Sequence, residues 1–385
     1  MKFNFVVACF FLLIGGCKTL DELPAVVDLR ELGEQMKNSP EDVKKIHQQV
    51  KKTQRSLKKQ VGSARQLFSV LHKAVERKWG KKNTERASNK KYVKYSNDYK
   101  ARTIIDFEKS RVEVETIASQ DTRALLIKAI TTTLLTSSDP NKTDIFSSAD
   151  PILGDEPFLY KQVLDQDNLP IRYLWRANRF SEYLVNNKLV KDKRDGHIIY
   201  SVQFDLVENN AHLRKIQFSD YVLAASKKYN IPASLIYGVI ETESSFNPYA
   251  VSSANAYGLM QVIPATAGRD VYQRIKKVSG QPSKNTLFNP QYNIDIGSAY
   301  LSILRDNYLH KITTLDNRHY AIISSYNGGA GNVLRIFSQD RDQAFRQINS
   351  LSASMFYQIL TTKHPKLESR NYLKKVTKAE MKYQP

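Results

Sequence analysis

Two glutamates, Glu241 and Glu243, lie in the segment VIETESSFNP at residues 239–248. The pattern predicts the end of a helix, in which residues three or four positions apart share a face and residues two apart do not. Glu243 continues an apolar stripe of the kind that faces a core, whereas Glu241 lies off it and is expected to be a solvated charge. The stripe is formed by Ile236, Val239 and Ile240.

A carboxyl group in apolar surroundings resists ionisation, so its pKa rises. Such a group still holds a proton near neutral pH, which is what a general acid needs. The spacing therefore makes Glu243 a candidate general acid. On this segment alone, the alternative is a glutamate at a helix end that bends out to water.

Three further stretches of the carboxy-terminal half contain residues that a helix or turn does not require. GLMQ at 258–261 offers an amide beside a thioether, a combination suited to a sugar face and its acetamido group. SYNGGAG at 325–331 places a tyrosine and an asparagine before a glycine turn, and ESRNY at 368–372 opens the last predicted helix. Taken singly, each stretch also fits core packing or a helix cap.

Taken together and in order, ESSFNP, GLMQ, YNGGAGNV and ESRNYLKKV resemble the catalytic domain of the family 1 lytic transglycosylases, the goose-lysozyme-like peptidoglycan lyases. The stretches YVKYSNDYKARTIIDFEKSRVEVETIAS, EPFLYKQV and IIYSVQFDLV are similar to the amino-terminal domain of membrane-bound members. The resemblance covers residues 90–380.

Carried over position by position, the resemblance implies that Glu243 is the catalytic glutamate and that Tyr372 lies near it. Ser325 stands where the family often has alanine, a small-for-small exchange. The resemblance assigns substrate binding to the remaining motif residues, Ser244, Met260, Gln261, Tyr326, Asn327 and Glu368.

Most glycosidases use two carboxylates, but the motifs place no second attacking acid beside Glu243. The resemblance implies a different reaction, in which one glutamate protonates the bond between N-acetylmuramic acid and N-acetylglucosamine. The same glutamate then takes a proton from the muramic acid's C6 hydroxyl, which closes a 1,6-anhydro ring without water. The alternatives are a muramidase that uses water and an inactive wall-binding scaffold. A scaffold is expected to have replaced one of Glu243, Gln261 and Tyr372, and none is replaced.

No cofactor is implied, and the seven histidines lack metal-ligand spacing.

The amino terminus, MKFNFVVACFFLLIGGCKTL, contains an apolar run from Phe3 to Ile14. The run is short for a bilayer span and has the length of a signal-peptide core. The following Gly-Gly-Cys17 resembles a bacterial lipobox, with isoleucine where leucine is commoner. This implies removal of residues 1–16, lipidation of Cys17 and, because Lys18 follows, a place on the periplasmic leaflet of the outer membrane. The alternative is an ordinary signal peptide or anchor.

Both cysteines lie in this amino-terminal segment, so no disulfide or thiolate metal site is expected in the exported body.

The chain carries 58 Lys+Arg against 38 Asp+Glu, a formal charge of +20, which indicates an anionic partner or surface. Much of this excess lies in residues 37–94, where apolar residues recur at helical spacing from Ile46 to Val75, with Gly62 as a break. We expect a basic amphipathic helix that packs on the next domain, lies on anionic lipid or is a solvated spacer. A nucleic-acid arm has similar composition, but an exported lipoprotein is not expected to meet nucleic acid.

Four regions follow: 1–16 as signal peptide, 17–90 as lipidated basic tether, 91–210 as an α+β domain and 211–385 as the catalytic domain. Alternating residues predict strands at 102–107, 111–117 and 197–206, beside helices at 122–136 and 180–187 and a loop at 137–157. The remainder predicts helices at 212–229, 232–243, 264–275, 290–308, 318–326, 330–338, 353–361 and 368–380. The fold class is therefore α+β multidomain, a small α+β domain followed by an all-α domain, which the resemblance makes lysozyme-like.

Overall fold

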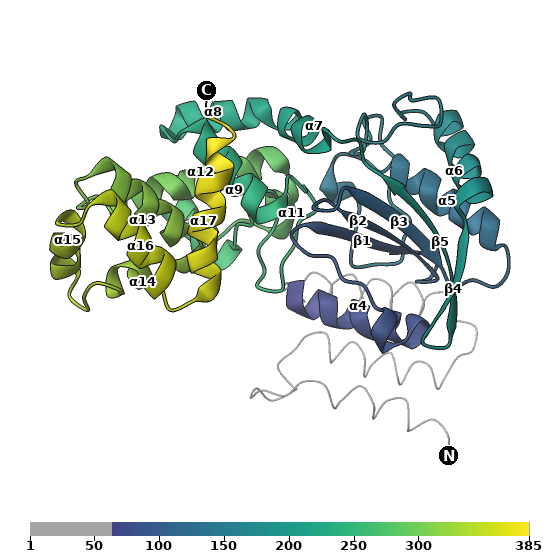
Figure 1. Ribbon diagram of the computed structural model, residues 1–385, viewed down its shortest axis with the longest axis horizontal. Helices are drawn as coiled ribbons and strands as arrows, with labels where there is room; N and C mark the ends of the chain where they lie inside the picture. Colours follow the sequence, from purple (N-terminus) through teal and green to yellow (C-terminus); the bar gives the residue numbers. More distant parts are fainter. Residues whose placement is uncertain (1–63, 385) are drawn as a thin grey trace, which may run out of the picture. The chain divides into compact units, whose positions relative to one another are not determined.

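The computed structural model describes residues 64–384, and within this range the chain from Leu67 onward belongs to one compact unit (Figure 1). The predicted signal peptide, Cys17 and most of the predicted basic helix lie outside the described residues. No described helix is both long and apolar enough to cross a membrane.

The amino-terminal half is built on one antiparallel sheet with strand order β1-β2-β3-β5-β4. Its strands are β1 (Lys91–Ser96), β2 (Ala101–Asp106), β3 (Arg111–Thr116), β4 (Val190–Arg194) and β5 (His197–Asp205). The helices of this half are α4 (Ala64–Trp79), η4 (Lys81–Asn83), α5 (Thr122–Leu134), η5 (Pro140–Lys142) and α6 (Leu174–Lys188).

The strands predicted at 102–107 and 111–117 are confirmed as β2 and β3, which pair as an antiparallel hairpin. Its turn is closed by Asp106, whose carboxylate accepts the backbone N–H groups of Glu108 (3.1 Å) and Lys109 (3.0 Å). Ser110 then adopts a left-handed backbone with φ 53°, which returns the chain for β3. In the pairing register Ile105 lies opposite Val112, so the apolar residues share a face.

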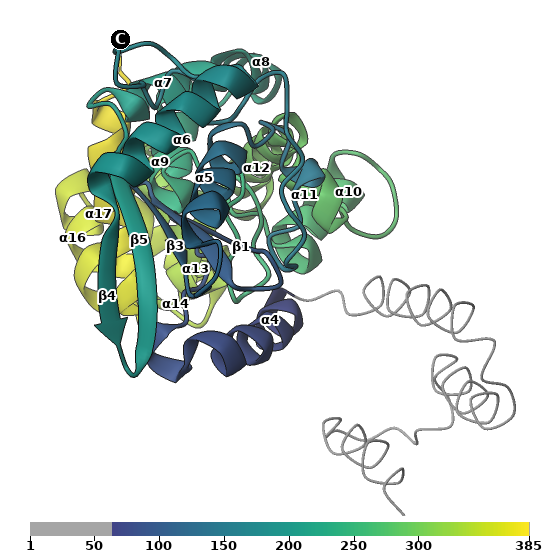
Figure 2. The same cartoon turned by 90° about the vertical axis from the view of Figure 1, so that its right-hand side faces the viewer.

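Helices cover both faces of the sheet (Figures 1 and 2). On one face, α4 packs through Leu71, Val75 and Trp79 on a cluster that includes Val93 and Tyr95 of β1. On the other face, the hydroxyl of Thr103 on β2 lies 2.7 Å from that of Thr133 on α5. For the described part of the basic segment, the structure thus favours the interpretation in which the helix packs on the next domain.

A buried ion pair lies beneath α4. The Nε of Arg102 donates to Glu115 at 2.5 Å, and the guanidinium lies over the ring of Trp79, 4.0 Å from its centroid. Arg194 of β4 donates to the second carboxylate oxygen at 2.7 Å. An unpaired charge at this depth would be costly to bury, so Arg102 and Glu115 depend on each other. The Trp79 ring covers the guanidinium and stabilises the pair.

The carboxy-terminal half is helical. Its elements are α7 (Asn210–Gln217), α8 (Ser219–Tyr229), α9 (Ala233–Ser244), η6 (Pro264–Gly268), α10 (Arg269–Arg274), α11 (Lys284–Phe288), α12 (Pro290–Ile303), η7 (Leu304–Tyr308), α13 (Leu315–Gly328), α14 (Ala330–Arg335), α15 (Arg341–Asn349), α16 (Ala353–Lys363) and α17 (Leu367–Met381). All eight predicted helices have counterparts. The helix predicted at 212–229 is two helices separated at Phe218, and α11 and α15 were not predicted.

An aromatic cluster joins the sheet to the helical half. The rings of Tyr92, Phe158 and Tyr249 lie between 5.1 and 5.6 Å from one another. The hydroxyl of Tyr249 donates to the backbone carbonyl of Ser137. Since Tyr249 follows α9 by five residues, the end of that helix is fixed against the sheet half.

Candidate active site

The two helices that carry the candidate catalytic residues are packed unusually closely. A Cβ atom added to Gly238 of α9 would lie 3.1 Å from the backbone nitrogen of Glu380 on α17. Only glycine therefore allows this approach without displacing α17. The crossing places the last turn of α9, with Glu243, beside the first turns of α17, with Tyr372.

The chain turns sharply away at the end of α9. Ser245 and Phe246 both adopt left-handed backbone conformations, with φ 51° and 60°. Two such residues in succession are unfavourable by about 1 kcal/mol or more each, and the 1% exposure of Phe246 shows that packing holds the turn. This conformation leaves the Glu243 side chain partly exposed at the end of the helix, where a substrate can reach it.

The environment of Glu243 favours the protonated acid. Burial raises the pKa of Glu243 to about 8, against a hydrogen bond from Tyr372 and the charge of Lys90, which lower it, while the charge of Glu368 raises it further. The carboxyl group therefore carries a proton at neutral pH although a path to solvent remains.

Two tyrosines flank this carboxyl group. Tyr372 is 5% exposed, and burial together with the charge of Glu243 raises its pKa well above the usual value. Its hydroxyl lies near the carboxyl but outside ideal hydrogen-bond geometry and has no other partner, as is common before substrate binds. Burial and the same charge raise the pKa of Tyr326. Both phenols are hydrogen-bond donors at neutral pH.

The GLMQ turn is fixed from below by Asn293 of α12. The Asn293 side-chain oxygen accepts the backbone N–H of Met260 at 2.8 Å, while its amide donates to the carbonyls of Tyr257 (2.7 Å) and Leu287 (2.8 Å). Gly258 has φ 71°, and an added Cβ would lie 2.4 Å from the Asn293 amide. The turn therefore requires both the glycine and the asparagine.

Met260 and Gln261, the last two residues of the GLMQ turn, differ in their contacts and backbone conformation. The Met260 side chain is fully buried, and its carbonyl accepts the Tyr326 hydroxyl at 2.8 Å. Gln261 is 8% exposed and left-handed, with φ 46°, and its amide donates to the Gly258 carbonyl at 2.9 Å. Met260 thus supports the turn and Tyr326, while a strained non-glycine residue at position 261 is typical of functional sites.

Asn327 lies near the end of α13, just before the glycine turn, and its side chain connects α13 to α17. Its side-chain oxygen accepts the Ser369 hydroxyl at 2.7 Å, and its amide lies 3.5 Å from the carboxylate of Glu368. Gly328 allows the contact, because an added Cβ would lie 2.7 Å from the ring of His364. Glu368 is thereby held near the site but remains exposed.

Ser244 and Glu241 lie away from the carboxyl group of Glu243. The Ser244 hydroxyl is buried and donates to the Ile240 carbonyl of its own helix at 3.0 Å. Glu241 was expected to be a solvated charge, but its carboxylate pairs with Lys382 and accepts the Tyr383 hydroxyl. The expectation was wrong because the two residues that follow α17, Lys382 and Tyr383, contact that side of α9.

Two residues with a part in the site were missed in the sequence. Asn293 carries a signal, since it is a polar residue on a buried face of a predicted helix. Lys90 carries none. It precedes β1, far from the helical motifs, and reaches the site because the Asn247 amide donates to the Asn89 carbonyl at 3.2 Å. Lys90 itself pairs with Glu108 at 2.7 Å.

In the part of the chain that the structure describes, no three His, Cys, Asp or Glu side chains gather as a metal site would require.

Comparison with known proteins shows which family the chain belongs to. A family model described as the amino-terminal domain of membrane-bound lytic murein transglycosylase C matches residues 49–217, and the transglycosylase SLT domain matches residues 220–349. A membrane-bound lytic murein transglycosylase C from Yersinia enterocolitica is 49% identical over 310 residues, 80% of this chain and 86% of the relative. The chain belongs to the membrane-bound lytic murein transglycosylase C family. A member from Photorhabdus laumondii is 48% identical over 80% of this chain and 87% of its own length.

Membership in the membrane-bound lytic murein transglycosylase C family makes the chain an enzyme, a lytic transglycosylase that acts on peptidoglycan. Glu243, the GLMQ turn and Asn327 lie within the SLT match, whereas Tyr372 and Glu368 follow it. Two solved lytic transglycosylases are also similar. The one from Pseudomonas aeruginosa is 23% identical, covers 43% of this chain and 23% of its own and has a TM-score of 0.34. The 70 kDa enzyme from Escherichia coli is 25% identical, with coverages of 43% and 24% and a TM-score of 0.34.

Proposed function

We propose that the chain cleaves the β-1,4 bond between N-acetylmuramic acid and N-acetylglucosamine without water and leaves 1,6-anhydro ends. The observation that carries the proposal is a single protonated carboxyl, Glu243, whose pKa of about 8 comes chiefly from burial. In the described chain, Glu368 is the one carboxylate whose charge raises that pKa; it is exposed, and its carboxylate lies 3.5 Å from the Asn327 amide. We therefore assign Glu368 to orienting Asn327 rather than to attack.

In the first step, the protonated Glu243 donates its proton to the glycosidic oxygen as the bond breaks. Its raised pKa suits this role, because an acid works best when its pKa lies near the working pH. Tyr372 donates a hydrogen bond to the carboxylate that forms. The donor lowers the pKa of Glu243, so it stabilises the product of proton transfer.

In the second step, the Glu243 carboxylate takes the proton of the muramic acid's own C6 hydroxyl, whose oxygen attacks the anomeric carbon. A nucleophile held within the same sugar has an effective molarity of about 10⁵ M or more, far above that of water. The intramolecular ring closure therefore outcompetes hydrolysis. The acid that began the cycle is restored.

Substrate positioning is proposed for the motif residues around the acid. Gln261 and Asn327 present amides suited to acetamido groups, with Glu368 orienting Asn327. Met260 holds Tyr326, and Ser244 ties the last turn of α9, so these residues shape the site.

The test is the mass of the released muropeptides. Ring closure gives products lighter by one water than those of a muramidase, and they lack a reducing end. Products with ordinary hydrated muramic ends would show that water attacks, and an absence of any product from intact peptidoglycan would favour a wall-binding scaffold.

We also propose that Cys17 is lipidated and that the enzyme faces the periplasm from the outer membrane. The lipobox-like sequence before Cys17 supports this placement, as does the description of the relatives as membrane-bound. Cys17→Ser is expected to remove the protein from the outer-membrane fraction. Retention of the variant in that membrane would refute lipid anchoring at this cysteine.

A further inference from the structure

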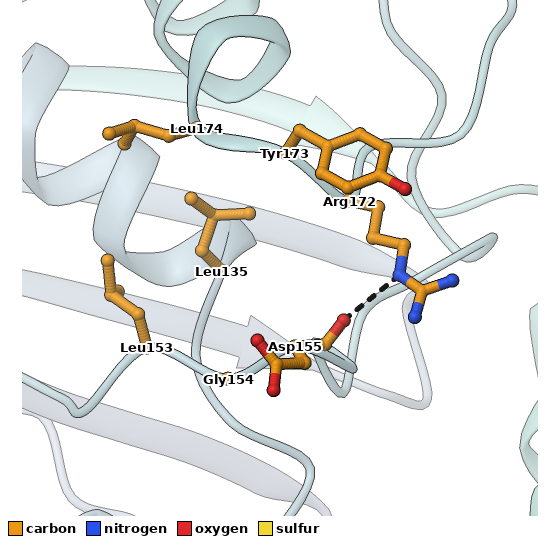
Figure 3. A pocket seen from close by; sticks show the side chains of 7 residues that line it. All are labelled: Leu135, Leu153, Gly154, Asp155, Arg172, Tyr173 and Leu174. Atoms are coloured by element: carbon orange, nitrogen blue, oxygen red, sulfur yellow. Dashed lines mark hydrogen bonds between the residues drawn. The ribbon is translucent and has the colours of Figure 1, made fainter.

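The sheet half contains a pocket of about 440 Å³ that the reaction above does not use (Figure 3). Three segments form it: the residue after α5, a stretch of the loop that follows, and the segment leading into α6. Pockets that bind small ligands have volumes of about 300–1,000 Å³, so the size is appropriate for one. The lining residues are Leu135, Leu153, Gly154, Asp155, Arg172, Tyr173 and Leu174.

Backbone hydrogen bonds form the pocket wall without any ligand. The N–H of Ser137 donates to the Ile152 carbonyl at 3.1 Å, and the N–H of Gly154 donates to the Leu135 carbonyl at 3.0 Å. A Cβ on Gly154 would lie 2.8 Å from the Cα of Ser137, so glycine is required for this close approach. The wall is therefore pre-organised, which reduces the cost of binding.

The pocket has an apolar side and a charged side. In Figure 3 the three leucines lie together, while the Asp155 carboxylate and the Arg172 guanidinium lie on the other side. The Nε of Arg172 donates to the backbone carbonyl of Asp155 at 3.0 Å, which fixes the guanidinium at the rim. In the described part of the chain, neither charged side chain belongs to an ion pair, so each charge is available to a ligand.

The rim exposes large apolar side chains. Tyr173 is 60% exposed, Leu174 55% and Leu153 47%. Adjacent exposed apolar residues on one surface are typical of an interaction site. A ligand for this pocket must therefore combine small apolar groups with one anionic and one cationic group.

We propose that this pocket binds the stem peptide of peptidoglycan. The proposal rests on the chain's action on peptidoglycan and adds a second contact with that polymer. A stem peptide containing a diamino acid carries free carboxylates, a free ammonium group and small alkyl side chains. Its carboxylate pairs with Arg172, its ammonium with Asp155, and its methyl groups contact the leucines. A purely anionic ligand would meet the Asp155 carboxylate, and a neutral glycan would leave both charges unpaired.

The pocket is structurally joined to the catalytic helix. The Ser137 carbonyl, next to the pocket wall, accepts the hydroxyl of Tyr249, which follows α9. A strand held by its peptide at this pocket stays bound to the enzyme between cleavage events. Such tethering raises the local concentration of substrate without changing the chemistry. It is therefore expected to lower KM for peptide-bearing glycan and to leave kcat unchanged.

The experiment measures binding of a synthetic stem tetrapeptide, with one diamino acid, to full-length Glu243→Gln protein by calorimetry. Two modified probes are compared with it, one with its carboxyl groups amidated and one with its side-chain amine acetylated. Arg172→Met and Asp155→Asn, each in the Glu243→Gln background, are expected to weaken binding about tenfold or more. Amidation should then have no further effect on the Arg172→Met protein, and acetylation none on the Asp155→Asn protein.

Arg179→Met is the matched control, because Arg179 lies on α6 outside the pocket and pairs with Asp167 at 2.7 Å. It should bind all probes as the parent does. In the active enzyme, Arg172→Met should raise KM for peptide-bearing glycan while sparing kcat and the turnover of peptide-free glycan.

Equal binding by the pocket variants and the parent would overturn the proposal. So would competition by peptide-free glycan, which would indicate a sugar site. Equal affinity for peptides of unrelated sequence would instead indicate a general protein-docking surface. Because binding is measured without turnover, hydrated muramic products would refute the ring-closing reaction and leave this result intact.

Discussion

Glu243, the acid proposed to cleave the glycan, should also destabilise the fold at neutral pH. In the unfolded chain a glutamate ionises around its ordinary pKa of 4.5, whereas burial raises the pKa of Glu243 in the folded protein to about 8. Because the folded-state pKa is the higher one, its contribution to stability is fully present below about pH 4.5. That contribution is lost as the pH rises through the folded pKa of about 8.

Glu243→Gln removes this term while keeping the size of the side chain. Each pH unit above 4.5, up to the folded pKa, costs about 1.4 kcal/mol, so the ceiling at pH 7 is about 3 kcal/mol. The side chain is partly exposed, and solvent screening reduces the expected gain to about 1–2 kcal/mol. The variant is therefore expected to be more stable than the active enzyme at pH 7.

The assay is urea-induced unfolding of both proteins at several pH values from 4 to 9, which gives the free energy of unfolding at each pH. The difference between variant and wild type should be small near pH 4, grow with pH and become constant above about pH 8. Glu241→Gln is the control on the same helix. It loses the ion pair with Lys382 and can no longer accept from both Lys382 and Tyr383, so it should not stabilise the protein at any pH.

A stability difference that does not change with pH would refute the proposed burial of the acid. The same conclusion would follow if wild type were more stable than Glu243→Gln at pH 7.

Three other predictions follow from the site and the sheet. Turnover should fall above about pH 8 as Glu243 loses its proton, and a rate that rises through pH 9 would contradict its role as acid. Tyr372→Phe should reduce kcat less than Glu243→Gln does and move the alkaline limb to higher pH, because the lost hydrogen bond lowers the pKa of Glu243; an unchanged rate and profile would remove Tyr372 from the site. Trp79→Ala should cost about 3–5 kcal/mol in unfolding free energy, because it opens a cavity over Arg102. A loss below 1 kcal/mol, by the same urea assay, would show that α4 is not part of the folded core.

The raised pKa of Glu243 could be predicted from sequence because a helix repeats at a fixed spacing. Glu243 falls on an apolar stripe, and that position alone raises the expectation of a perturbed acid. The hydrogen-bond and ion-pair partners of Glu241 could not be predicted in the same way. Its partners come from the end of α17, and the pairing depends on how closely two helices cross.

The sheet was predicted where its strands alternate. The strands β3 and β5 have a buried and a less buried face and β2 is buried almost throughout, whereas β4 is almost wholly exposed and β1 is buried on both faces. Neither β1 nor β4 alternates between buried and exposed residues, as a strand with one solvent-facing side does. Lys90 was missed for a related reason, since its place near the site follows from the docking of two halves rather than from local sequence.

The Tyr92, Phe158 and Tyr249 cluster has a consequence for dissection of the enzyme. A fragment that begins after β5 would expose the Tyr249 ring to water and leave its hydroxyl without the Ser137 acceptor. The turn that ends α9 would lose its lateral support at the same time. Truncation at that boundary thus removes part of the scaffold that aims the acid, so the excised helical fragment is a poorer catalyst than its intact sequence motifs suggest.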